Sequence, residues 1–287
     1  MQIFKTAFLM TALTLLLMLI GNWLGGETGL ILAFAFAAVM NFVSYFYSDK
    51  IALKTYNAQP VTREQLPNVY RILEGLSGRE NLPMPKVYLI PTDSPNAFAT
   101  GRNPQHASVA VTRGILGLLT DDELEGVLAH ELGHVRNRDI LISSIAATLA
   151  GAIMLIARMA GWAALFGGFG GRDDREGGSL GAIALMIVAP IAAMMIQLAI
   201  SRSREYAADA SGAHWTGNPQ ALARALQKLD AYSKQRPMLA TPSTAHLFII
   251  APRTRQMLAG LFSTHPPIPA RVARLLGHDE AAYIERS

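Results

Sequence analysis

Four apolar stretches with almost no charged residues, each long enough to cross a bilayer as a helix, constrain this chain more than any other feature. They lie between Lys5 and Glu27, between Glu27 and Asp49, from Asp139 to about residue 166 with Arg158 inside, and between Glu176 and Arg202. About 20 apolar residues suffice to cross the roughly 30 Å hydrocarbon layer. Only 16% of the residues are charged, against about a quarter in soluble domains. The sequence therefore predicts an integral membrane protein with about four transmembrane helices.

Basic residues beside these stretches predict the orientation of the chain. They are Lys5 before the first stretch, Lys50 and Lys54 after the second, and Arg202 and Arg204 after the fourth. The loop GNWLGGETG between the first two stretches has no Lys or Arg. The positive-inside rule therefore places both termini and the polar segments in the cytosol. An incomplete crossing stays open for the last two stretches, because Arg158 and LFGGFGG also suit a tilted or partly buried hairpin.

The polar residues fall in two pieces that we expect to form one cytosolic domain. Residues 1–49 would form two transmembrane helices and 50–139 the first part of the domain; 140–201 would form a transmembrane hairpin and 202–287 the second part. Each polar piece is small for a domain, and the hairpin would bring the two together at one membrane face.

Hydrophobic periodicity predicts a mainly α fold with a small antiparallel β-sheet. Apolar residues recur at helical spacing over residues 62–78. The segments PKVYLI and ASVAVTRGI are rich in Val and Ile and are typical of strands. Thr120 and Glu123 match a capping box, which predicts that a helix begins near residue 120.

This last helix carries the sequence HELGH, residues 130–134. His130 and His134 are four residues apart, so they share one helix face and can bind the same zinc ion. Glu131 is offset around the helix, where it can take a proton from the water that zinc activates. The pattern predicts a zinc site with Glu131 as general base.

A catalytic zinc site needs a third protein ligand, and the absence of cysteine excludes a thiolate. The extended form of the motif also fails, because Asn137 and Ile140 stand where it has glycine and histidine. The segment SRSREYAADASG, residues 201–212, follows the fourth apolar stretch. We predict that Glu205 is the third ligand of one zinc ion per chain. Asp209 would then accept the free ring N–H of a ligand histidine. A surface charge that pairs with nearby arginines is the alternative for Glu205.

Three segments carry a resemblance to a known family. HELGHVRNRD, SRSREYAADASG and FSTHPPIPARVARL resemble the motifs of the HtpX membrane metalloproteases, relatives of the CAAX prenyl proteases, and the resemblance covers essentially the whole chain. It implies a multi-pass zinc endopeptidase of the gluzincin type in the bacterial cytoplasmic (inner) membrane. Its active site would face the cytosol and degrade damaged or misfolded membrane proteins. By the resemblance, His130, His134 and Glu205 hold zinc, Glu131 is the base, and Asp209 supports a ligand.

The resemblance also implies positions near the active site for two further residues. His265 would stabilise the oxyanion of the tetrahedral intermediate, or it would instead order the proline-rich turn before the last helix. Asn96 would lie beside the substrate, because an edge strand can pair with an extended peptide; an ordinary turn asparagine is the alternative. We expect Arg271 to be a structural partner of the carboxylates.

Two other functions stay open beside quality-control proteolysis. One is processing of a lipidated C-terminal motif, and the other is a non-catalytic membrane scaffold with a structural metal, which usually has four protein ligands. The expected partners are the membrane and protein substrates, with a homo-oligomer or quality-control partners also open. A net charge of +4 is too small and too scattered to indicate nucleic-acid binding.

Overall fold

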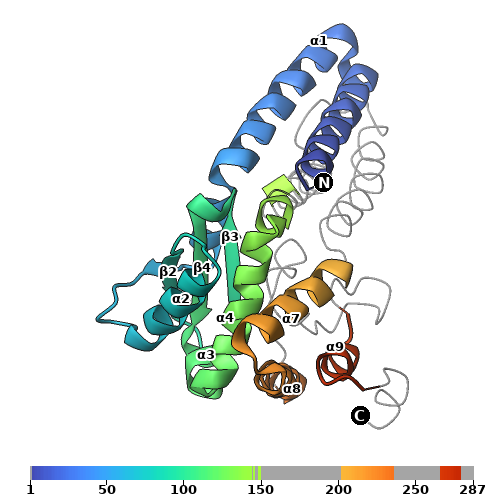
Figure 1. Cartoon of the computed structure of the whole chain (residues 1–287). Helices are drawn as coiled ribbons and strands as arrows, with labels where there is room; N and C mark the ends of the chain where they lie inside the picture. Colours follow the sequence, from blue (N-terminus) through green and yellow to red (C-terminus); the bar gives the residue numbers. More distant parts are fainter. Residues whose placement is uncertain (1, 144, 146–147, 150–201, 236–265, 279–287) are drawn as a thin grey trace.

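The computed structural model describes residues 2–143, 145, 148–149, 202–235 and 266–278 (Figure 1). The fourth predicted transmembrane stretch, most of the third, and His265 lie outside these residues. The predicted number of membrane-spanning helices therefore stays a prediction.

Helix α1, Gln2–Thr55, folds back on itself as two antiparallel arms (Figure 1). The turn includes Gly26, whose φ of 57° lies in the left-handed region that glycine adopts readily. Asn41 Nδ2 donates a hydrogen bond to Thr14 Oγ1 at 2.9 Å and joins the arms. The second arm, Gly26–Thr55, is long and apolar enough to cross a membrane, whereas the first contains a shorter apolar segment, Met10–Leu19.

A four-stranded sheet follows, in the order β1-β2-β4-β3. Its strands are β1 (Gln59–Pro60), β2 (Lys86–Ile90), β3 (Ala97–Gly101) and β4 (Ala107–Thr112). β1 with β2, and β3 with β4, are antiparallel pairs, but β2 and β4 are parallel. The predicted all-antiparallel sheet was therefore wrong. The chain reverses twice between β2 and β4, and β4 inserts between β2 and β3 and so pairs parallel to β2.

Helices make up most of the rest of the described chain. They are α2 (Pro67–Arg79), η1 (Pro104–His106, a 3₁₀ turn), α3 (Arg113–Leu118), α4 (Asp121–Arg136), α7 (Arg202–Thr216), α8 (Pro219–Gln235) and α9 (Ile268–Leu275). The predicted helix at 62–78 begins later, at Pro67. A mainly helical fold is thus confirmed, with a small mixed sheet.

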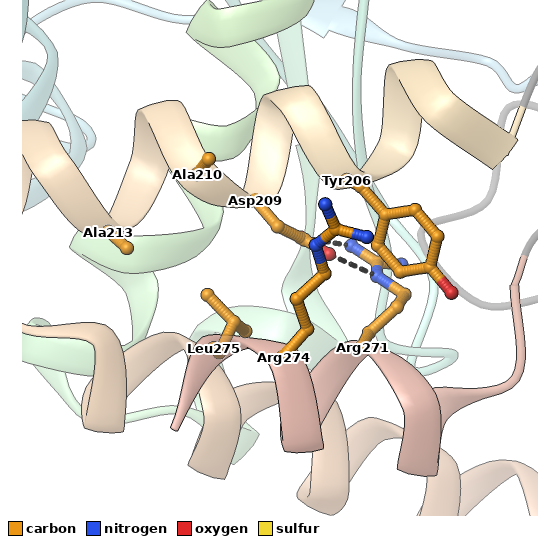
Figure 2. A pocket seen from close by; sticks show the side chains of 7 residues that line it. All are labelled: Tyr206, Asp209, Ala210, Ala213, Arg271, Arg274 and Leu275. Carbon is orange, nitrogen blue, oxygen red and sulfur yellow. Dashed lines mark hydrogen bonds and ion pairs between the residues drawn. The ribbon is translucent and has the colours of Figure 1, made fainter. Parts of the chain in front are cut away.

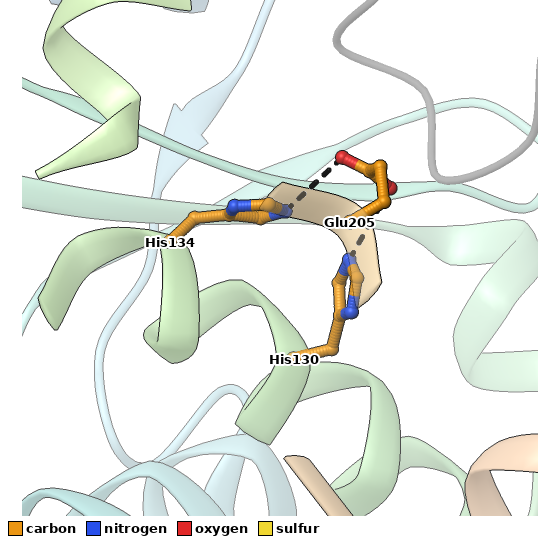
Figure 3. Close-up of side chains that lie close together, drawn as sticks. All are labelled: His130, His134 and Glu205. Carbon is orange, nitrogen blue, oxygen red and sulfur yellow. Dashed lines mark ion pairs between the residues drawn. The ribbon is translucent and has the colours of Figure 1, made fainter. Parts of the chain in front are cut away.

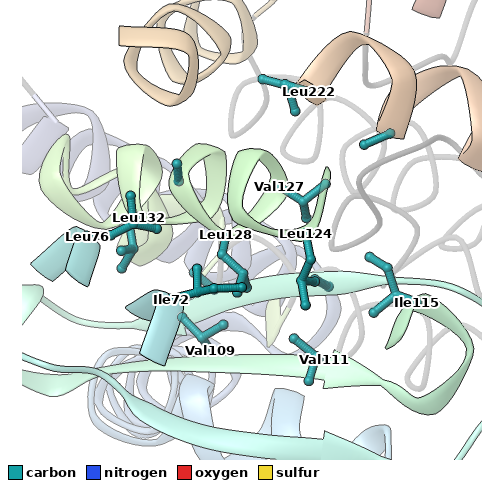
Figure 4. Packing of buried hydrophobic residues seen from close by; sticks show 14 of the residues in the cluster. Ile72, Leu76, Val109, Val111, Ile115, Leu124, Val127, Leu128, Leu132 and Leu222 are labelled. Atoms are coloured by element: carbon teal, nitrogen blue, oxygen red, sulfur yellow. The ribbon is translucent and has the colours of Figure 1, made fainter. Parts of the chain in front are cut away.

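The main core lies between one face of the sheet and the helices (Figure 4). Leu76 of α2 and Leu128 of α4 pack with Val109 and Val111 of β4, and Leu222 of α8 joins the same cluster. Side chains on a strand alternate between faces, so Phe98 and Ala110 point the other way, where they pack with Leu53 near the end of α1. The sheet therefore holds α4 on one face and the end of α1 on the other.

Candidate metal centre

Helix α4 begins where the capping box predicts. Glu123 Oε2 accepts a hydrogen bond from the Thr120 N–H at 2.9 Å, and Thr120 Oγ1 accepts one from the Glu123 N–H at 3.5 Å. Lys228 of α8 donates to the same carboxylate at 2.7 Å. The start of the helix that carries both histidines is thereby attached to α8.

Helices α4 and α7 approach each other closely through small residues. A Cβ on Gly212 of α7 would lie 3.1 Å from the backbone N of His130, and one on Gly133 of α4 would lie 3.3 Å from Ala208 Cα. A larger residue at either glycine would push the helices apart. The close packing brings Glu205, one turn into α7, opposite the two histidines of α4 (Figure 3).

The side chains of His130, His134 and Glu205 converge on one point (Figure 3). His134 Nε2 lies 3.4 Å from Glu205 Oε1, and His130 Nε2 lies 3.9 Å from Glu205 Oε2. One ligand atom from each residue lies within 4.8 Å of the other two. Tetrahedral zinc with bonds near 2.1 Å separates its ligands by about 3.4 Å. Two imidazoles and a carboxylate at these distances fit such an ion.

Each histidine presents its other ring nitrogen to a buried carboxylate. Asp209 Oδ1 lies 2.9 Å from His130 Nδ1, the contact that the sequence predicts, and Asp139 Oδ2 lies 3.3 Å from His134 Nδ1. Such partners fix the orientation of a metal-bound imidazole. Burial disfavours the charged form of His134, but the hydrogen bonds to Asp139 and Glu205 raise its pKa to about 10. A metal ion therefore competes with a proton at Nε2 of His134, the nitrogen that faces Glu205.

The sequence left Asp139 without a role. It stands three positions after Arg136, the last residue of α4, and its contact with His134 depends on the turn after the helix, where Arg138 adopts a φ of 58°. This left-handed conformation is uncommon for a residue other than glycine, so no spacing rule indicates it. The carboxylate five positions after the second histidine is the only signal in the sequence.

Arg271 of α9 contacts two carboxylates of the site, and Figure 2 shows its hydrogen bonds to Asp209. Its side chain is fully buried, and it donates two hydrogen bonds to Asp209, from Nε at 2.8 Å and from Nη2 at 2.7 Å. Its Nη1 lies 3.6 Å from Glu205 Oε2. Burial would raise the pKa of Asp209, but the charge and hydrogen bonds of Arg271 lower it to about 2. Arg271 is thus the carboxylate partner that the sequence predicts.

The side chain of Glu131 extends from α4 to the edge strand β3. It is 6% exposed, and its Oε2 accepts a hydrogen bond from the Ala99 N–H at 2.9 Å. Burial raises the pKa of its carboxyl, opposed by His130 and His134. A raised pKa brings a carboxylate closer to the range in which it can take up a proton and release it again near neutral pH.

Asn96 is buried directly before β3. Its backbone N–H donates to Thr112 Oγ1 at 2.8 Å, and its carbonyl accepts from the Thr112 N–H at 2.9 Å. These bonds fix the start of the edge strand. The predicted substrate-binding role of Asn96, like the roles of the other site residues, stays a prediction.

This fold and this constellation are those of a metallo-protease. Residues 63–279 match the model of peptidase family M48, and the chain belongs to that family. It is similar to proteins named Protease HtpX homolog. One from Desulforapulum autotrophicum is 59% identical over 94% of this chain and 88% of the relative, and one from Thermococcus sibiricus is 56% identical over 94% of each. The predicted resemblance to HtpX proteases is thus confirmed.

A solved structure shares the fold at low sequence identity. The crystal structure of Ste24p from S. mikatae superposes with a TM-score of 0.54 at 20% identity. The match covers 96% of this chain and 65% of Ste24p, so the arrangement of elements described above also occurs inside a longer chain.

Proposed function

We propose that this metallo-protease is a membrane-bound zinc endopeptidase that cleaves damaged or misfolded membrane proteins. The observation that carries the proposal is the convergence of His130, His134 and Glu205 within 4.8 Å, with Glu131 buried beside them. Two imidazoles and one carboxylate form the ligand set of a catalytic rather than a structural zinc site, because they leave a coordination position for water or substrate.

The apolar surface of α1 supports a place in the membrane. Among the described residues, the large exposed hydrophobic side chains lie on α1, with Met84 as the exception; Phe4 is 74% exposed, Leu19 69% and Leu32 65%. A contiguous apolar surface of this kind marks an interaction with lipid or protein. The basic residues next to the apolar stretches favour an orientation with the active site on the cytosolic side, and the similarity to HtpX homologues supports the bacterial inner membrane.

The residues of the chain divide the chemistry among them. Bound at this site, zinc would act as a Lewis acid on the peptide carbonyl and lower the pKa of water. Glu131 takes the proton from the attacking water and delivers it to the amine of the leaving peptide. Asp209 and Asp139 hold the rings of His130 and His134 in place. Asn96 and the edge strand β3 contact the extended substrate, and His265 donates a hydrogen bond to the oxyanion.

The experiment is zinc-dependent cleavage by the purified full chain in detergent. The protein is stripped of metal with a chelator and reloaded with zinc. It is then given an unfolded membrane protein that carries no covalent lipid and, separately, a peptide with a lipidated C-terminus. We expect zinc to restore cleavage of the unmodified substrate. If only the lipidated peptide is cleaved, the function would be processing of a lipidated C-terminal motif instead of quality control. Zinc binding without cleavage of either substrate would overturn the proposal.

A further inference from the structure

A cavity of about 340 Å³ lies between the end of α1 and the sheet, apart from the metal centre. Phe46, Asp49 and Lys50 line it from α1, Lys86 from β2, and Arg102 and His106 from the β3–β4 hairpin. We call this cavity the interfacial pocket. Its volume is within the range of small-ligand sites. It borders the end of α1, which packs on the sheet face opposite to α4.

The interfacial pocket is electropositive. Lys50, Lys86 and Arg102 carry three positive charges against the single carboxylate of Asp49. Across the described ranges, no carboxylate forms an ion pair with any of these three residues, whereas Arg79 and Lys228 are both paired. The uncompensated charge favours an anionic ligand.

Arg102 is held in a defined orientation at the wall of the pocket. Its guanidinium carbon lies 5.6 Å from the centroid of the Phe46 ring, and its Nη2 donates to His106 Nε2 at 2.9 Å. The other ring nitrogen of His106 bonds Asn103 Oδ1 at 2.8 Å. A guanidinium has five N–H donors in a planar fork that matches phosphate oxygens. The remaining donors of Arg102 can therefore bind a phosphate at little cost in side-chain entropy.

The pocket lies at the level where α1 would leave the membrane. This placement rests on the membrane location proposed above. Tyr45, Phe46 and Tyr47 are exposed shortly before Asp49, and aromatic residues gather at the boundary between lipid and water. The end of α1 is fixed to the sheet, since Leu53 packs with Phe98 and the rings of Tyr56 and Phe98 lie 5.6 Å apart. Lys86 and Arg102 are thereby held at the height of lipid headgroups.

We propose that the interfacial pocket binds the phosphate headgroup of an anionic phospholipid. The ligand phosphate accepts hydrogen bonds from Arg102 and neutralises Lys50 and Lys86. Basic residues at this level attract anionic lipids. The bound lipid fixes the sheet, and with it the metal centre on the opposite face, at one height above the bilayer.

The test compares lipid retention by the zinc-loaded full chain and two charge variants. Protein from nanodiscs of phosphatidylcholine with phosphatidylglycerol is released into the gas phase, and bound lipid is counted by native mass spectrometry. The pocket variant is Lys86→Gln with Arg102→Gln. The matched control, Arg71→Gln with Lys234→Gln, removes two charges elsewhere on the surface. We expect phosphatidylglycerol affinity to fall about tenfold or more in the pocket variant alone, because each basic residue near the surface contributes about fivefold.

Three results would overturn the proposal. The first is that the pocket variant retains as much phosphatidylglycerol as the wild type. The second is that the control variant loses as much of this lipid as the pocket variant. The third is that inorganic phosphate displaces the lipid, which would indicate that the ligand is a soluble anion. A thermal melt of each variant checks folding, and Lys86→Gln alone replaces the double variant if that does not fold. Zinc-dependent cleavage in detergent is measured on the same samples. If the protein cleaves its substrate but binds no lipid specifically, the lipid site in the interfacial pocket is rejected and the proposed function is not.

Discussion

Buried charges around the metal centre depend on one another for their stability. Arg271 is fully buried and Asp209 is 3% exposed, and a buried charge without a partner is costly. Spacing within one helix determines how His130 and His134 lie, so the sequence predicts this part of the site. It does not indicate Asp139, whose contact with His134 depends on the left-handed turn at Arg138.

Asp209→Asn should destabilise the protein by about 3 kcal/mol, because the buried Arg271 then loses the carboxylate that accepts its two hydrogen bonds and keeps only the longer contact with Glu205. The measurement is the midpoint of thermal unfolding at neutral pH. Arg71→Gln breaks an exposed ion pair with Asp121 and should change stability by less than about 1 kcal/mol. Adding Arg271→Met to Asp209→Asn should recover part of the loss. An Asp209→Asn melt at the wild-type temperature would contradict this account of the cluster.

At the level of elements, α4 positions the metal centre through its capped start and its contact with α7. The start was predictable because a capping box is local. The direction of β4 was not, since the strand segments alone do not say whether β4 adds at the edge of the sheet or inserts beside β2. The α4–α7 contact joins segments on either side of residues 150–201, and both the predicted hairpin and the shared metal chemistry indicated it.

Glu123→Gln should weaken the start of α4 in a pH-dependent way. Burial would raise the pKa of Glu123, but Lys228 and the Thr120 N–H lower it. A carboxyl with a lowered pKa in the folded state stabilises the protein above its unfolded pKa of about 4.3, and this contribution is lost as pH falls through the folded value. We expect a loss of about 2 kcal/mol at about pH 7 that shrinks below about pH 4.

Denaturant unfolding of Glu123→Gln at both pH values measures this effect. Glu74→Gln, which removes an exposed partner of Arg63, is the control and should lose less than about 1 kcal/mol. A loss for Glu123→Gln that is the same at both pH values would argue against the ion pair with Lys228 as its source.

Gly212→Ala should separate α7 from α4 and weaken metal binding. The new Cβ would lie 3.1 Å from the backbone N of His130, and overpacking of this kind costs about 1–3 kcal/mol. Gly75→Ala in α2 meets no atom within 4 Å and should stabilise its helix by about 1 kcal/mol. Zinc titration and thermal unfolding of both variants check the pair. Unchanged zinc affinity in Gly212→Ala would show that the helix contact does not position the ligands.

For the whole molecule, the sequence predicts membrane attachment from length and hydropathy, and the apolar exterior of α1 agrees with it. The family was predictable because its motifs carry the chemistry, and the curated relatives confirm it. The interfacial pocket was not predictable, since its residues come from α1, β2 and the β3–β4 hairpin and meet only when α1 packs on the sheet.

The orientation of the chain can be tested because it has no native cysteine. Glu27→Cys, at the turn of α1, should react with a membrane-impermeant maleimide in cells whose outer membrane has been made permeable. Glu64→Cys, in the polar segment, should react only after the inner membrane is also opened. Both glutamates are exposed, so burial does not explain a difference. Labelling of Glu64→Cys before the inner membrane is opened would contradict a cytosolic active site.

The most direct test of the central claim is the cleavage rate of Glu131→Gln, with zinc content determined on the same sample. Glutamine keeps an oxygen that can accept the hydrogen bond from Ala99, so the site should keep its shape and its zinc. Loss of a general base slows a reaction by roughly 10²–10⁴-fold, and we expect cleavage of an unfolded membrane protein to fall by that amount. Undiminished cleavage by a zinc-loaded Glu131→Gln would contradict the account.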